Sequence, residues 1–251
     1  MLIDTHAHIH SADYPIDPSL ALRNAAAVGV EKIICVGTNI LDSQQAITFA
    51  AAHNNCYASV GLHPHDAKLG KEAYQELSKL ASNPTVKVIG ECGLDYYYNN
   101  SPKKDQEAAF RFQIELALQY KLPLIFHIRE AFDDFFRIID EYAGVKGAVH
   151  SFTSNQQHAE EVISKGLYIS LNGIVTFTKD PNQLMAARRI PLNRLLLETD
   201  APFLTPVPKR GKVNEPANVL LVAEFLSELR QEPLEILAHT TSANACELFN
   251  I

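Results

Sequence analysis

The sequence lacks three features that would each have indicated a specialised class of protein. It holds only four cysteines, Cys35, Cys56, Cys92 and Cys246, and no CxxC pair. Because each lies in or beside an apolar run, we expect reduced core cysteines rather than disulfides or a cysteine-rich zinc site. No run approaches the roughly 18 apolar residues of a membrane span. Asp4 and the histidines after it interrupt any apolar N-terminal segment, so we expect no signal peptide, no membrane association and a cytoplasmic location.

The sequence also lacks an excess of positive charge. Lys and Arg number 22 against 29 Asp and Glu, and the net charge is −7. A surface that coats nucleic acid non-specifically needs clustered Lys and Arg, so that class is disfavoured. An enzyme that takes a short stretch of backbone into a metal-lined pocket is still compatible with this charge. No heptad or long exposed apolar stripe demands a second copy, so we expect a monomer.

Several catalytic and nucleotide-binding motifs are absent as well. There is no GxGxxG after the first apolar run, no GxxxxGK[ST], no HExxH and no GxSxG. Dinucleotide binding, P-loop chemistry, a zincin and a serine hydrolase therefore all lack their signal.

What the sequence does contain is a regular alternation of short apolar runs with helical patterns. The expected strands are 1–5, 32–37, 56–61, 86–91, 122–127, 146–150, 167–171 and 195–200. The expected helices are 18–28, 42–53, 71–81, 104–120, 131–142, 155–165, 181–189, 216–229 and 233–249. Strand–helix alternation with short connections indicates a parallel sheet, and eight units suggest closure into a (β/α)₈ TIM barrel. A doubly wound open sheet is the main alternative. Because no flexible linker interrupts the pattern, we expect one domain over 1–251.

Carboxylate and imidazole side chains, which are common metal ligands, follow these apolar runs. The candidate metal ligands are His6, His8, Glu91, His127, His150 and Asp200. His6 and His8 are two apart, so the period-2 alternation of a strand points both imidazoles to one face. A lone histidine at a strand end is more often structural, but two on successive strands favour a site. Together these residues predict two metal ions at the carboxyl ends of the barrel strands, where barrel enzymes place their active sites.

Two carboxylates among these ligands are the candidate catalytic residues. Glu91 directly follows a run of Val and Ile, and such a carboxylate suits bridging two ions roughly 3.5–4 Å apart. Asp200 should lie near His6 and His8 because the eighth strand closes against the first. It could ligate one ion, orient the attacking water and take its proton. Glu198 and Asp95 are expected to stand behind the ligands, with Asp95 equally plausible as a turn residue or a substrate contact.

Candidate substrate contacts lie on the same expected face. His63 and His65 end the third strand, and we expect them to hold a phosphate or leaving group rather than a metal. The long irregular segment 201–215 contains Arg210 in the most compact basic cluster, 209–212. Arg matches phosphate oxygens with a two-pronged hydrogen bond, so Arg210 is a candidate phosphate clamp, although a solvated charge run is nearly as common. Lys103 and Lys104 form a second, weaker basic patch.

The chain resembles the TatD family of metal-dependent deoxyribonucleases, within the amidohydrolase-like TIM barrels. The motifs that carry the resemblance are Asp4–His8, Val60–His65, Gly90–Asp95, Phe126–His127, His150–Phe152, Glu198–Pro202 and Arg210–Pro216. They occur in order over most of the chain. The resemblance implies a (β/α)₈ barrel and two divalent cations, Mg²⁺ or Mn²⁺. It implies His6, His8, Glu91 and Asp200 around one ion and Glu91, His127 and His150 around the other. It also implies 3′→5′ exonuclease activity on DNA, often on single strands.

Two other functions compete with the nuclease. A lactonase, an amidohydrolase or a deacylase that removes D-amino acids from tRNA would need the same metals, because a fold does not fix a function. A metal-stabilised scaffold that binds partners without turnover is the non-catalytic alternative. Imidazole ligands favour Zn²⁺ or Mn²⁺, whereas carboxylates suit Mg²⁺ and Mn²⁺, so the sequence leaves Zn²⁺ possible.

Overall fold

A computed structural model describes residues 1–251, in which strands and helices alternate from one end of the chain to the other. The strands are β1 (Leu2–Ala7), β2 (Val30–Val36), β3 (Cys56–Val60), β4 (Val86–Asp95), β5 (Leu124–Arg129), β6 (Gly147–Val149), β7 (Tyr168–Leu171) and β8 (Leu195–Leu197). The helices are α1 (Pro18–Ala27), α2 (Ile40–Ala52), α3 (Gly70–Ala81), α4 (Lys103–Tyr120), α5 (Phe132–Ile139), α6 (Gln156–Ser164), α7 (Pro181–Arg189), α8 (Val219–Arg230) and α9 (Leu234–Phe249).

The chain forms two compact units. Unit 1 contains Met1–Cys35 and Ser151–Ile251, and unit 2 contains the continuous segment Val36–His150. In unit 2 the parallel pairs are β3 with β4, β4 with β5, and β5 with β6. In unit 1 they are β1 with β2 and β7 with β8, and an isolated parallel bridge joins Ala7 to Ala201 just beyond β8.

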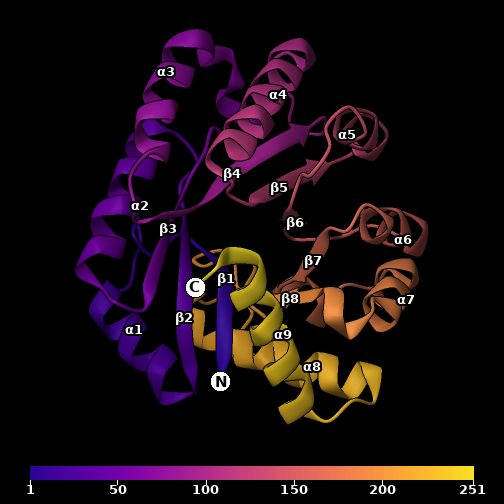
Figure 1. Cartoon of the computed structure of the whole chain (residues 1–251). Helices are drawn as coiled ribbons and strands as arrows, with labels where there is room; N and C mark the ends of the chain where they lie inside the picture. The colour runs from indigo at the N-terminus through magenta and orange to yellow at the C-terminus, as the bar shows by residue number, and fades with distance from the viewer. The chain divides into compact units, whose positions relative to one another are not determined.

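The core of each unit lies between its strands and the helices that follow them. In unit 2 the rings of Phe110, Phe126 and Phe135 from α4, β5 and α5 pack at centroid distances of 5.2–5.9 Å. All three side chains are buried. In unit 1 the last helix, α9, lies against β1 (Figure 1) and buries Leu237 and Phe249. Ser242 of α9 donates a hydrogen bond to the carbonyl of Met1, so the two ends of the chain are tied together.

The strand order in the sheet follows the chain order from β1 to β8, with helices between successive strands. Parallel strands joined by helices in simple succession define the (β/α)₈ class, so the predicted TIM-barrel fold is confirmed. The expectation of one domain over 1–251 stays a prediction.

Two helices begin at an aspartate followed by a proline, the pattern that favours a helix start. Asp17 and Asp180 cap α1 and α7, and Pro18 and Pro181 occupy the first helical position. Strand ends differ more from expectation. β4 runs on to Asp95 and β5 to Arg129, so Glu91 and His127 lie within strands rather than at their ends. β8 stops at Leu197, three residues before Asp200.

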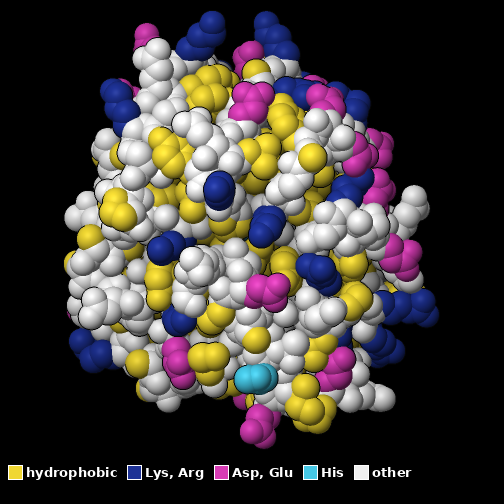
Figure 2. Space-filling model, in the orientation of Figure 1, with side chains coloured by type: hydrophobic (Ala, Val, Ile, Leu, Met, Phe, Trp, Pro, Cys, Tyr) yellow, Lys and Arg dark blue, Asp and Glu magenta, His cyan; other side chains and the backbone are white.

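The surface carries no basic coat on the face shown in Figure 2. Lys and Arg side chains are interspersed there with Asp, Glu and apolar groups. No helix is both long and apolar enough to cross a membrane. The four cysteines are free, and three of them are buried, as expected for core thiols.

Candidate metal centre

Three predicted ligands of unit 1 converge on one point, and we call them the His6 group: His6, His8 and Asp200. The Nε2 atoms of the two imidazoles are 3.2 Å apart. Asp200 Oδ1 lies 3.6 Å from His6 Nε2 and 3.4 Å from His8 Nε2. His6 is fully buried and the other two side chains are nearly so, which limits competition from solvent. The group therefore presents two imidazole nitrogens and one carboxylate to the same small volume.

Backbone hydrogen bonds hold the His6 group together. The amide of Asp200 donates to the carbonyl of His6 at 2.8 Å, and the amide of His8 donates to the carbonyl of Ala201 at 2.7 Å. Asp200 has a φ of +60°, a left-handed conformation uncommon for a residue with a side chain. That turn directly after β8 carries the carboxylate beside β1, so sequence-distant residues meet although β8 is short.

A buried carboxyl behind the His6 group was not recognised from the sequence. Asp4 accepts hydrogen bonds from the amide of Thr199 at 2.9 Å and from its hydroxyl at 2.6 Å. Burial raises the pKa of Asp4 to about 8, although these hydrogen bonds oppose the rise. Asp4 thereby fixes Thr199, the residue before Asp200. Its place in an apolar strand, two residues from His6, was the signal that could have identified it.

Glu198, directly after β8, is a buried carboxylate that accepts two hydrogen bonds. Its Oε1 accepts from the amide of Ser151 at 2.7 Å and from the side-chain amide of Asn172 at 3.2 Å. Asn172 donates to the hydroxyl of Ser151 too, so three residues fix the turn that follows His150.

The second set of predicted ligands lies in unit 2, and we call it the Glu91 group: Glu91, His127 and His150. Glu91 Oε1 is 2.7 Å from His127 Nδ1 and 3.1 Å from His150 Nε2. Burial works to raise the pKa of Glu91, but the charge of His150 and the hydrogen bonds from His127 and His150 outweigh it and hold that pKa well below its usual range. The carboxylate is therefore charged and available as a ligand.

His63 also approaches Glu91, with Nε2 at 3.5 Å from Oε1, and together with Glu91 and His127 it forms a set of potential cation ligands. A backbone hydrogen bond to its ring nevertheless supports a second role. The backbone amide of His65 donates to His63 Nδ1 at 3.1 Å, so Nδ1 is an acceptor and a neutral ring carries its proton on Nε2. Burial and the neighbouring His127 lower the pKa of His63 to about 4, so the ring is neutral at pH 7. The geometry favours His63 as an N–H donor to substrate.

Asp95 orients two histidines of unit 2. Its Oδ2 lies 3.1 Å from both His65 Nε2 and His127 Nε2, while its Oδ1 accepts from the amides of Tyr97 and Tyr98. Burial works to raise the pKa of Asp95, but the hydrogen bond from His127 and those amides lower it overall. A histidine that ligates a metal commonly donates its other N–H to a carboxylate. His127 matches that pattern, with Nε2 donating to Asp95 and Nδ1 facing Glu91.

The His6 group has the donor set and spacing of a divalent-cation site, and within unit 2 the ligand atoms close enough to share an ion are those of Glu91, His127 and His63. His150 approaches Glu91 but does not complete such a set with His127. Ligand atoms bound at about 2.0–2.2 Å to one ion lie about 3.0–3.5 Å apart in tetrahedral or octahedral geometry. The separations within the His6 group are 3.2–3.6 Å, and His150 lies 3.1 Å from Glu91. Imidazoles and carboxylates together suit Zn²⁺, Mn²⁺ or, with more oxygen ligands, Mg²⁺.

The basic loop residue Arg210 is anchored within unit 1. Its guanidinium lies over the ring of Phe177 at 3.9 Å and donates one N–H to the carbonyl of Thr205 at 2.8 Å. Since a guanidinium has five N–H donors, others are left for an anion. His10 is also buried, with its ring 6.2 Å from that of His8. The continued period-2 spacing after His6 and His8 was the signal for it.

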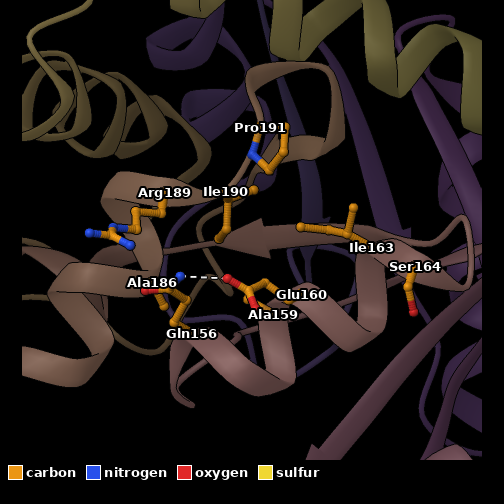
Figure 3. Close-up of a pocket in the computed structure, with 9 residues that line it drawn as sticks. All are labelled: Gln156, Ala159, Glu160, Ile163, Ser164, Ala186, Arg189, Ile190 and Pro191. Carbon is orange, nitrogen blue, oxygen red and sulfur yellow. Dashed lines mark hydrogen bonds between the residues drawn. The ribbon is translucent and has the colours of Figure 1, made fainter.

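A separate hollow of about 380 Å³ lies between α6 and α7. Figure 3 shows its mainly apolar lining, which includes Ala159, Ile163 and Ile190, and a hydrogen bond from Gln156 to Glu160 at one side. None of the predicted metal or substrate residues lines it. The candidate metal centre is therefore not in this hollow.

The sequence and structure were compared with those of known proteins. Residues 3–250 match the model of the TatD related DNase family. "Uncharacterized metal-dependent hydrolase YabD" of Bacillus subtilis is 39% identical over 254 residues, covering 100% of both chains. "3'-5' ssDNA/RNA exonuclease TatD" of Salmonella typhimurium is 34% identical and covers 100% of this chain and 99% of that one. The crystal structure of YjjV, a TatD homologue from Escherichia coli, matches with a TM-score of 0.93 at 29% identity, covering 100% and 98%. The chain therefore belongs to the TatD related DNase family of metal-dependent hydrolases.

Proposed function

We propose that this hydrolase shortens single-stranded DNA from its 3′ end by hydrolysing phosphodiester bonds with the help of two divalent ions. The observation that carries the proposal is the pair of donor groups, both with the ligand types of a cation site and the His6 group with its spacing as well. The name of the Salmonella relative, an exonuclease on single-stranded DNA and RNA at 34% identity over the whole chain, supports the choice of substrate.

The metal ligands proposed are His6, His8 and Asp200 in one group and Glu91, His127 and His150 in the other. Mg²⁺ or Mn²⁺ is the expected ion, with Zn²⁺ also compatible with the imidazoles. Divalent ions bound there would lower the pKa of a water molecule toward neutrality and offset charge on the scissile phosphate. Asp95 and the Asp4–Thr199 pair keep ligand side chains and the ligand-bearing turn in place before substrate arrives.

The protein's own groups perform the remaining tasks. Asp200 orients the attacking water and accepts its proton, which requires hydrogen-bond reach and an ionised carboxylate. Glu91 is the second catalytic carboxylate. His63, through Nε2–H, together with His65 and the free N–H groups of Arg210, holds the phosphodiester. Neutral and cationic donors of this kind stabilise a phosphate because its oxygens accept only.

A gel assay with end-labelled single-stranded DNA tests the proposal. With a 5′ label and Mg²⁺, Mn²⁺ or Zn²⁺, we expect a ladder that shortens from the 3′ end; with a 3′ label, we expect immediate release of a mononucleotide. EDTA and Asp200→Ala should abolish both, whereas Asp133→Ala, at an exposed position in α5, should behave like the unaltered protein. The rate on an RNA of the same sequence, compared with the rate on the DNA, shows whether the enzyme prefers deoxyribose or ribose.

Intact DNA with every metal would overturn the nuclease. Cleavage of a D-aminoacyl-tRNA ester with an intact nucleic-acid backbone would replace it with the deacylase. Metal analysis provides a second measurement, in which His8→Ala and His150→Ala each remove one ion from a total of two. A total of one ion, lost in both variants, would contradict the two-ion arrangement.

A further inference from the structure

Two exposed tyrosines project from the segment that directly follows β4. Tyr97 is 55% exposed and Tyr98 54%, although large aromatic side chains usually bury most of their surface. Their rings contact each other edge to face with centroids 4.9 Å apart. Exposed aromatic pairs need an explanation, because adjacent apolar groups on a surface commonly mark a binding site.

A cation accompanies these rings. The guanidinium of Arg129, at the end of β5, lies 4.1 Å from the ring centroid of Tyr97 and 4.6 Å from that of Tyr98. Arg129 is exposed, so its guanidinium is accessible to solvent as well as to the two rings. We call Tyr97, Tyr98 and Arg129 together the tyrosine platform.

The tyrosine platform adjoins the Glu91 group through a short series of contacts within unit 2. The ring of Tyr98 meets that of His65 at 5.5 Å, and His65 shares the Oδ2 atom of Asp95 with His127. His127 in turn contacts Glu91. The tyrosine platform is therefore in direct contact with His65, one of the residues proposed to hold the phosphate.

The tyrosine side chains are not needed to hold their own loop. The loop is fixed by the backbone amides of Tyr97 and Tyr98, which donate to Asp95 Oδ1 at 3.0 and 2.9 Å. The rings and hydroxyls of the two tyrosines take no part in these hydrogen bonds. Substitution of either side chain therefore leaves the hydrogen bonds that position Asp95 intact.

We propose that the tyrosine platform is a base-stacking subsite, on which a nucleobase of the substrate strand lies against Tyr97 or Tyr98 while Arg129 faces the strand backbone. This inference rests on the proposed function, because it names where that substrate is held. Proteins that bind single strands combine aromatic faces with Arg or Lys in this way, and the stacking tolerates any base since every base has a π-face. The platform requires an unpaired base, which agrees with a single-stranded substrate.

Steady-state kinetics on two single-stranded 12-mers of equal length test the subsite. One carries normal bases and the other carries abasic sugars at its last three 3′ positions. The unaltered protein should have a KM about 5- to 150-fold higher for the abasic strand, the range expected for one stacked base. Tyr97→Ala/Tyr98→Ala should raise the KM for normal DNA by a similar factor and leave that for the abasic strand unchanged. The kcat should stay within about twofold, because stacking contributes equally to substrate and transition state.

Three controls separate stacking from general damage. Tyr97→Phe/Tyr98→Phe keeps both rings and should have the KM values of the unaltered protein. Tyr97→Leu/Tyr98→Leu keeps bulk without a π-face and should have the KM values of the double alanine variant. Tyr120→Ala removes a partly exposed tyrosine at the far end of α4, about 25 Å along that helix from Lys103, and should change neither KM.

Equal KM values for the two strands in the unaltered protein would overturn the stacking subsite while leaving the exonuclease intact. Failure to cut either strand would count against the proposed function instead. Fluorescence anisotropy of the same labelled strands, measured with EDTA present, then judges the subsite without turnover. A weaker Kd for the abasic strand that disappears in the double variant supports stacking, and identical Kd values refute it.

Discussion

Hydrogen-bond direction decides what each histidine of unit 2 can do. His63 receives a backbone N–H at Nδ1, so it offers a proton at Nε2 and not a lone pair. His127 has a carboxylate at each nitrogen, so one nitrogen can keep its proton while the other ligates. Ring position alone would have grouped both histidines as ligands of one ion. The direction of the hydrogen bonds therefore gives the two rings different proposed roles, His63 as a donor to substrate and His127 as a metal ligand, although both lie close to Glu91.

The carboxylate of Asp95 gives the first prediction at this scale. Asp95→Asn keeps the size of the side chain but removes the charge that accepts from His127 Nε2, so the imidazole becomes less basic and less well oriented. We expect metal affinity at the Glu91 group to fall roughly 10- to 100-fold with little change in secondary structure. Competition titration against a chelating dye measures the metal affinity.

Asp105→Asn, in the first turn of α4, is the matched control and should leave metal affinity unchanged. Equal affinities for Asp95→Asn and the unaltered protein would show that His127 does not depend on Asp95 for its orientation.

At the scale of elements, β4 and β5 stay paired well past their apolar residues. Gly93 lies opposite His127, Leu94 opposite Ile128 and Asp95 opposite Arg129. This extension holds Glu91 and His127 on rigid neighbouring strands rather than on loops. Sites on strands are positioned more precisely than sites on loops.

Close approach of these strands depends on Gly93. It has a φ of +142°, and a Cβ there would lie 2.1 Å from the carbonyl oxygen of His127. Gly93→Ala should therefore push β4 away from β5, lower the free energy of unfolding by about 2–4 kcal/mol and weaken metal binding. Gly144 has a φ of +80° but open space where a Cβ would lie. Gly144→Ala should therefore lower the free energy of unfolding by only about 1 kcal/mol. Denaturant titration compares them, and similar losses would refute the steric argument.

Helix α5 carries a pH-dependent contribution. The hydroxyl of Tyr96 and the guanidinium of Arg137 donate to Asp134 and lower its pKa. A carboxyl whose folded pKa is below its unfolded value, about 3.9, stabilises the fold above that pH and loses this effect as pH falls through the folded pKa. Because Asp134 is about one-third exposed, we expect Asp134→Asn to destabilise by only roughly 0.5–1 kcal/mol at pH 7.

Below about pH 3 the difference between Asp134→Asn and the unaltered protein should shrink toward zero. Asp133→Asn, at an exposed position in the same turn, is the control and should leave the free energy of unfolding at pH 7 nearly unchanged. A difference for Asp134→Asn that is constant from pH 7 to pH 3 would contradict the assigned cause.

At the scale of the whole molecule, metal binding couples to stability. Ligands that bind only the folded state stabilise it by about 2.7 kcal/mol at a free concentration of 100 times Kd. Removal of metal with EDTA should therefore lower the Tm by several degrees, and Mn²⁺ or Zn²⁺ should restore it. The His8→Ala/His150→Ala double variant, which lacks a ligand in each group, should show no such rise. Thermal scans by circular dichroism measure the Tm with and without metal. A Tm independent of metal would argue against both sites.

Much of the fold and the candidate site could be predicted because their signals are local. Apolar runs, prolines at helix starts and glycines such as Gly29 and Gly166, both with positive φ, follow directly from the chain. Tautomers, by contrast, depend on which backbone group faces a ring. Asp4 was missed because its partner, Thr199, is 195 residues away. The tyrosine platform could not be predicted because the stacking of Arg129 on Tyr97 is a contact between two strand ends that are far apart in the sequence.

The division of the chain between the two units also sets an order in time. Every residue of the Glu91 group has been synthesised once His150 leaves the ribosome, since unit 2 is one continuous segment. The His6 group has to wait for Asp200, because unit 1 is made from both ends of the chain. At roughly 5–20 residues per second, the delay is about 3–10 s. A nascent chain therefore holds all the residues of the Glu91 group for several seconds before it holds those of the His6 group, so the proposed two-ion hydrolysis cannot begin until Asp200 has been added.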